Sequence, residues 1–162
     1  MQTKEFLKLN LEWATEKVLL LIEEMKDAPL TFPTPNGGNH PLWVLGHLAY
    51  SEGVILQERM LGEPNPLAQW KDIFGDGTEP VDDSNVYPSF DQVMAKCREV
   101  HQANMALFDS LSEEDLDTPT KFCEPQHKKH FGTYRQCFQF VANHWLMHRG
   151  QVADARRAAR RT

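Results

Sequence analysis

Apolar residues recur along this chain every three or four positions, which is the spacing of amphipathic α-helices. The first such segment runs from Thr3 to about Met25, and the last runs from Tyr134 to Ala159 after a predicted helix cap at Thr133. The apolar face of the first segment comprises Leu7, Leu11, Ala14, Val18, Leu21, Ile22 and Met25, and it is widened by Phe6 and Trp13. Both patterns predict long helices that bury one face.

A second helix is predicted from Asn39 or His40 to about Leu61. Gly62 follows it directly, and glycine often ends a helix because it adopts the left-handed backbone conformation without strain. The apolar positions of this segment lie on nearly every side: Leu42, Trp43, Leu45, Leu48, Ala49, Tyr50, Val54, Ile55 and Leu56. A helix that is apolar on most sides is expected at the centre of a fold.

A third helix is predicted from a capping box at Ser89 and Gln92 to about Leu111. The connection before it, from Gly62 to Pro88, is rich in proline and glycine and includes a short helical piece from about Leu67 to Phe74. Connections of this length are often functional, and this one is expected to cover one end of a helix bundle.

Four predicted helices with one long crossover between the second and third favour an all-α fold, a four-helix bundle. The 162 residues suit a single domain that spans residues 1–162. Hydrophobic residues make up 41% of the chain and charged residues 25%, values that are ordinary for a globular protein. Trp13, Trp43 and Trp145 are expected to pack in the core or to line a pocket.

Charge and cysteine content narrow the functional classes. The formal net charge of -6 argues against a nucleic-acid partner. The three cysteines do not suit a disulfide framework, and Cys97 and Cys137 fall on apolar helical faces, which favours buried packing over nucleophilic chemistry. Since no apolar run reaches the ~20 residues of a membrane span and the N-terminus does not read as a signal peptide, a cytoplasmic protein without a membrane partner is predicted.

His144 and His148 form the first candidate for chemistry. Four residues apart on one helix, their side chains lie one above the other on the same face. His47 is flanked by apolar residues in the central helix, and a buried imidazole needs a partner for each ring nitrogen. If the two helices are neighbours, three neutral imidazoles can share one divalent ion and leave a coordination position open.

Two motifs in this chain resemble those of the DinB/YfiT-like superfamily. Residues 39–49, which contain Trp43, Gly46 and His47, resemble its second-helix motif, and residues 144–151 resemble its fourth-helix His-x-x-x-His-x-Gly-Gln signature. The resemblance covers essentially the whole chain in helix order and loop placement. It implies an up-down-down-up four-helix bundle, a metal triad of His47, His144 and His148, zinc or nickel as the divalent ion, and a homodimer.

The resemblance does not imply one reaction. Similar proteins include low-molecular-weight-thiol S-transferases, a thiol-dependent isomerase and hydrolases. The leading hypothesis is therefore a metal-dependent enzyme that uses a thiol or water as its nucleophile and acts on a small-molecule substrate. The alternatives are a metal-dependent hydrolase and a non-catalytic module that binds a metal or a small ligand.

The residues that would assist such a site are less defined by sequence. Trp145 stands where a zincin His-Glu-x-x-His motif would place its general base, so a proton acceptor must come from elsewhere. Glu52 and Tyr50 are candidates for this acceptor. The alternatives are a solvated or salt-bridged role for Glu52 and core packing for Tyr50. Gln151 follows His148 by three residues and could orient its imidazole.

Four other histidines are present. His127 and His130 form a rival ligand set, but they lie in a polar segment with two lysines and are expected to be solvated. For His40 and His101 the sequence indicates no partner.

Overall fold

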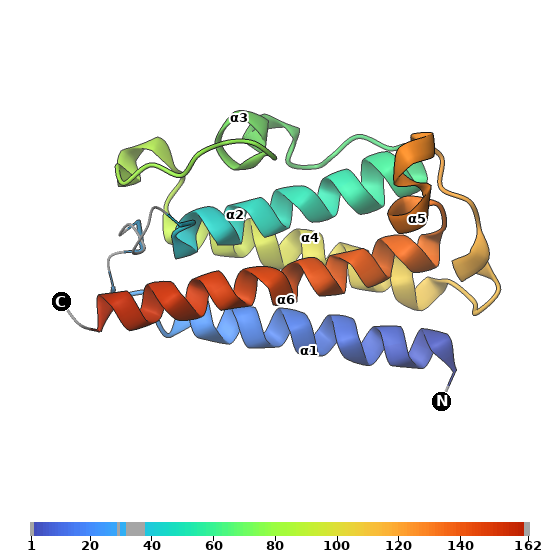
Figure 1. Cartoon of the computed structure of the whole chain (residues 1–162), viewed down its shortest axis with the longest axis horizontal. Coiled ribbons are helices and arrows are strands. Elements are labelled where there is room, and N and C mark those ends of the chain that lie inside the picture. The colour runs from blue at the N-terminus through green and yellow to red at the C-terminus, as the bar shows by residue number, and fades with distance from the viewer. Residues whose placement is uncertain (1, 29, 32–37, 161–162) are drawn as a thin grey trace.

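Long helices lie side by side along the longest dimension of the computed structural model of the chain (Figure 1), which describes residues 2–28, 30–31 and 38–160. These helices are α1 (Thr3–Glu23), α2 (Pro41–Glu52) with its π-helical continuation η1 (Gly53–Leu61), α4 (Phe90–Ser110) and α6 (Tyr134–Ala159). Within the described residues there is no β-strand, only an isolated bridge between Pro119 and Thr133. The predicted all-α class is confirmed.

Short helical elements occupy the two longer connections. Between η1 and α4 lie η2 (Ala68–Trp70), α3 (Lys71–Phe74) and η3 (Ser84–Val86). Between α4 and α6 lie η4 (Asp115–Asp117), η5 (Pro125–His127) and α5 (Lys128–Phe131).

The long helices pack as two pairs. α1 contacts α6 most extensively and α2 contacts α4, while further contacts between α2 and α6 join the pairs. In Figure 1, α2 and α4 run in one direction along the molecule, and α1 and α6 run in the other. The core lies between the pairs, where the largest fully buried side chains include Trp145, Phe108 and Phe138.

α2 is buried along its whole length, as its apolar pattern predicted. All twelve residues from Pro41 to Glu52 are buried. Two neighbouring helices, α4 and α6, cannot surround a helix, so a third element must cover its remaining side. η2 and α3 in the crossover contact α2 there, and Trp70 and Phe74 are buried in this layer.

The expected position of the crossover was wrong. It does not cover an end of the helices but runs back along the side of α2 (Figure 1). The physical reason is the all-round apolar surface of α2, which would otherwise meet water along its outer side. The piece predicted at Leu67 to Phe74 is helical, divided between η2 and α3.

Two aromatic residues of α1 also differ from expectation. Phe6 is 56% exposed and Trp13 is 50% exposed, so neither belongs to the core. The buried face of α1 turns toward the other helices, and its buried residues are Leu7, Leu11, Ala14, Thr15, Val18 and Ile22. A position next to an apolar stripe in sequence can thus point outward, because one helix has only a limited buried arc. Trp43 and Trp145 are buried, as expected.

Local signals set the ends of the helices as predicted. Ser89 caps α4 and Thr133 caps α6, each in a reciprocal capping box with the glutamine three residues later. η1 ends at Gly62, whose φ of 74° lies in the left-handed region. None of the described helices is long and apolar enough to cross a membrane.

Gly46 allows the crossover to approach α2. A Cβ atom at Gly46 would lie 2.3–2.5 Å from three ring atoms of Phe74, which is fully buried. Any larger residue at position 46 must therefore displace the ring of Phe74. At Gly150 in α6, an added Cβ meets no heavy atom of the described structure within 4 Å.

We therefore expect Gly46→Ala and Gly150→Ala to have opposite effects on stability. Gly46→Ala should lower the free energy of unfolding by about 1–3 kcal/mol, because the packed core cannot accept the methyl group without strain. Gly150→Ala should raise it by up to about 1 kcal/mol through helix propensity. Urea denaturation of both variants checks this. A Gly46→Ala protein as stable as the parent would contradict the close packing of the Phe74 ring against Gly46.

Candidate metal centre

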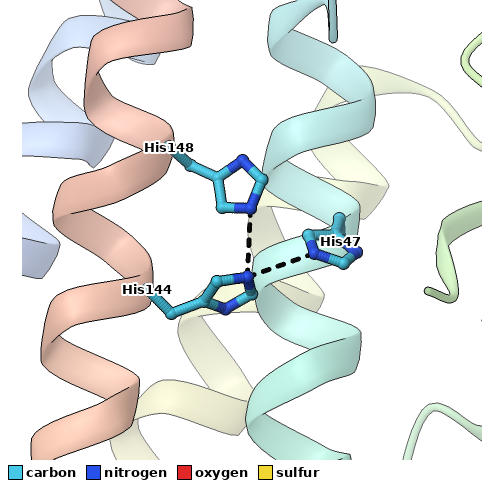
Figure 2. Close-up of side chains that lie close together, drawn as sticks. All are labelled: His47, His144 and His148. Atoms are coloured by element: carbon cyan, nitrogen blue, oxygen red, sulfur yellow. Dashed lines mark hydrogen bonds between the residues drawn. The ribbon is translucent and has the colours of Figure 1, made fainter. Parts of the chain in front are cut away.

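Three histidine side chains meet between α2 and α6. His47 comes from α2, and His144 and His148 come from successive turns of α6 (Figure 2). The Nε2 atom of His144 lies 3.2 Å from Nε2 of His47 and 3.0 Å from Nε2 of His148. The potential ligand atoms of the three residues all lie within 4.8 Å of one another. The predicted approach of the two helices therefore occurs.

The crossover orients His47. Its Nδ1 lies 2.8 Å from the carbonyl oxygen of Phe74, and because a carbonyl only accepts, Nδ1 must carry the proton. The lone pair of the neutral ring is then on Nε2, which faces the other two histidines. Trp43, one turn earlier in α2, stacks on the His47 ring at a centroid distance of 4.4 Å and an interplanar angle of 10°.

Gln151 orients His148 from within α6. The His148 Nδ1 atom lies 2.7 Å from Oε1 of Gln151. The same Oε1 accepts a second hydrogen bond, of 3.1 Å, from Nδ2 of Asn39, just before α2. This arrangement directs the Nε2 lone pair of His148 toward His144. Hydrogen bonds of this kind fix the tautomer of metal-binding histidines.

The surroundings keep the three imidazoles neutral. Burial lowers the pKa of His144 to about 3, with further lowering from the neighbouring charges of His148 and His47. Burial, with a further contribution from the charge of His47, lowers the pKa of His148 to about 4. The hydrogen bond to Gln151 and the charge of Asp76 act in the opposite direction. The pKa of His47 is lowered by burial as well. Neutral imidazole is the form that binds metal ions.

The geometry fits a divalent ion. Imidazole nitrogens bind zinc at about 2.0–2.1 Å, so tetrahedral ligation separates two of them by about 3.3 Å, close to the observed 3.0 and 3.2 Å. Across the described ranges, the triad is the only group of three or more histidine, cysteine or acidic side chains with this proximity. The rival residues His127 and His130 lie in η5 and α5, where His130 is exposed and His127 pairs with Glu124 at 3.6 Å.

Glu52 occupies a different part of the interior. Its carboxylate accepts hydrogen bonds from Nε1 of Trp145 at 2.7 Å and from Nδ2 of Asn104 at 2.9 Å, and it pairs with Nδ1 of His101 at 3.0 Å. Burial favours the neutral acid, but the charge and hydrogen bond of His101, with those from Asn104 and Trp145, lower the pKa of Glu52. Glu52 thus connects α2 to α4 and α6. Among the described residues, it does not belong to the group of side chains that could hold a metal ion together with the triad.

Tyr50, Cys97 and Cys137 have the protonation expected of buried groups. Tyr50 is 8% exposed, and burial raises the pKa of its hydroxyl, with smaller contributions from Glu58, Asp76 and Asp72. Burial raises the pKa of the Cys137 thiol to about 12 and that of Cys97 well above its usual value. Neither thiol is a nucleophile at neutral pH, which agrees with their expected packing role.

Sequence reasoning missed several partners. His40 caps α2 through Nδ1, which accepts from the Trp43 amide, and its Nε2 contacts the carbonyl oxygen of Val81. His101 pairs with Glu52. The proline at position 41 could have indicated the cap, because proline favours the first turn of a helix. No local signal could have revealed the carbonyl of Phe74, since any residue supplies one.

The chain was compared with known proteins at two levels. The model of one family, the DinB superfamily, matches residues 10–152. That range includes α2, the part of α6 that carries both of its triad histidines, and most of α1. The comparison with curated proteins gave no match.

The lowered pKa of His144 predicts how the metal-free protein responds to acid. The folded protein holds this pKa at about 3, against 6.5 for an ordinary histidine. Between these values the unfolded chain binds more protons, so the free energy of unfolding falls as the pH is lowered. From pH 6.5 to pH 5 we expect His144 alone to account for a loss of about 2 kcal/mol.

Urea denaturation in the presence of a chelator measures this loss. The pH dependence of a His144→Asn variant should be shallower than that of the parent by this amount. Equal pH dependence of the parent and His144→Asn would contradict the environment described for His144.

Proposed function

The chain belongs to the DinB superfamily, as its motifs predicted, and from this we propose that it is a divalent-metal-binding protein with His47, His144 and His148 as ligands. One observation carries the proposal: three Nε2 atoms from two helices converge, and Nδ1 of two of these rings is already hydrogen-bonded. Without an ion, a proton on His144 Nε2 can satisfy only one of the two facing lone pairs, whereas a shared ion satisfies all three nitrogens.

The helix arrangement supports a more specific description of the fold. α1 and α6 run in one direction and α2 and α4 in the other (Figure 1). We assign this as the up-down-down-up four-helix bundle with a long crossover between the second and third helices. The homodimer implied by the family resemblance stays a prediction.

A metal held by three protein ligands keeps at least one coordination position free, which is the pattern of catalytic sites. A zinc or nickel ion in this site would lower the pKa of bound water or of a bound thiol and could polarise a carbonyl group. The protein would contribute orientation and shape: Phe74 and Gln151 hold two of the imidazoles, and Trp43 forms a wall. We propose a metal-dependent enzyme of the low-molecular-weight-thiol S-transferase type.

Metal content tests the binding proposal. Untagged protein should contain about one equivalent of zinc or nickel by elemental analysis, and His47→Ala and His148→Ala should each lose it. His130→Ala is the matched control, because it removes an exposed histidine outside the triad. If both triad variants retained one equivalent of metal, the proposal would be contradicted.

Activity tests the enzymatic part. Protein loaded with zinc or nickel should conjugate an electrophilic small molecule with one or more of a panel of low-molecular-weight thiols, and His148→Ala should reduce the rate at least 100-fold. An ester and amide panel tests the alternative of a metal-dependent hydrolase. Turnover by His148→Ala equal to that of the parent in every assay would leave a non-catalytic binding module as the better description.

A further inference from the structure

One carboxylate lies beside the histidine triad. Oδ1 of Asp76 is 3.9 Å from Nε2 of His47, the nitrogen that faces His144. The Asp76 side chain is 92% exposed, whereas that of His47 is 5% exposed. Asp76 thus stands at the boundary between the triad, of which His144 is the half-buried member, and solvent. Its carboxylate is outside the group whose ligand atoms lie within 4.8 Å of one another, so its side chain must turn toward the triad to reach the same ion.

The chain holds Asp76 at this place through both of its flanks. On one side, the carbonyl oxygen of Phe74 accepts the hydrogen bond from His47 Nδ1. On the other, Oγ1 of Thr78 accepts a 3.1 Å hydrogen bond from Nε1 of Trp43. Because Trp43 and His47 are one turn apart in α2, the segment from Phe74 to Thr78 is fastened to a single helix face with Asp76 at its middle.

The two facing atoms are both electron-pair donors that one cation can share. Since Nδ1 of His47 carries the proton, its Nε2 presents a lone pair, and the carboxylate oxygen of Asp76 also presents lone pairs. Two electron-pair donors at this separation gain nothing from each other, but a cation would attract both. Carboxylate oxygen and imidazole nitrogen are both ordinary ligands of zinc, at about 2.0–2.2 Å.

The crossover is also the most acidic part of the chain. From Gly62 to Pro88 it has one basic residue, Lys71, and six acidic residues, which are Glu63, Asp72, Asp76, Glu79, Asp82 and Asp83. Negative charge gathered in this way raises the local concentration of cations. Among these acids, Asp76 is the one that the structure pairs with a triad histidine.

We propose that Asp76 is a fourth protein ligand of the divalent cation, an inference that rests on the proposed triad site. Three neutral imidazoles leave the charge of the ion unchanged, and one carboxylate would neutralise part of it, which favours retention of the ion away from water. Because its side chain is 92% exposed, Asp76 can rotate away without displacing core residues. It would then release its coordination position to water or a thiol.

The test compares two aspartates of the crossover. Asp76→Asn and Asp72→Asn remove the same charge four residues apart, and Asp72 is likewise exposed. In competition titrations with a zinc indicator, Asp76→Asn should weaken zinc binding at least tenfold, and Asp72→Asn should change it less than threefold. Asp76→Glu, which keeps a carboxylate, should recover part of the loss. The visible absorption of the cobalt-loaded protein should change in Asp76→Asn and not in Asp72→Asn.

The outcomes separate this inference from the proposed function. If His148→Ala abolishes zinc binding while Asp76→Asn binds like the parent, the triad stands and Asp76 is not a ligand. Equal weakening by the two aspartate variants would also overturn the inference, because it would indicate a general charge effect. If zinc binding is indifferent to His148→Ala, the site itself fails. Thermal unfolding of the metal-free aspartate variants should match the parent, because both aspartates are exposed, and this excludes misfolding as the cause of a loss.

Discussion

The burial of α2 on every side is the constraint from which the architecture follows. A helix without a polar face needs neighbours all round, and α4 and α6 can cover only part of it. The crossover therefore runs along its remaining side, close enough that Gly46 has no room for a side chain against Phe74. His47 belongs to this enclosed helix, so its imidazole depends on the protein rather than on water for polar partners.

Packing and chemistry are consequently coupled at the triad. The segment that covers α2 also supplies the carbonyl oxygen that selects the tautomer of His47. Gln151 has the corresponding role for His148 and is itself tied to Asn39 at the start of α2. Burial holds all three imidazoles neutral. The arrangement is thus prepared for a cation before one arrives, which reduces the reorganisation that binding requires.

A second polar cluster joins the helices elsewhere in the core. Glu52 connects α2 to α4 through His101 and Asn104 and to α6 through Trp145, the residue next to His144. Removal of one partner from such a buried network leaves the others unsatisfied, so these contacts also fix how α2 and α6 meet. The position of α6, and with it the placement of His144 and His148, therefore depends on polar contacts as well as on the apolar core.

Local sequence determined the helices and part of the site. Helical periodicity and the caps at Ser89 and Thr133 act within a few residues, so they could be read without a fold. The four-residue spacing of His144 and His148 likewise places both on one helix face. Tertiary structure alone decided the outward turn of Trp13, the path of the crossover, and the partners of Glu52 and His47. These depend on contacts between residues far apart in the chain, and a backbone carbonyl such as that of Phe74 has no signature in the sequence.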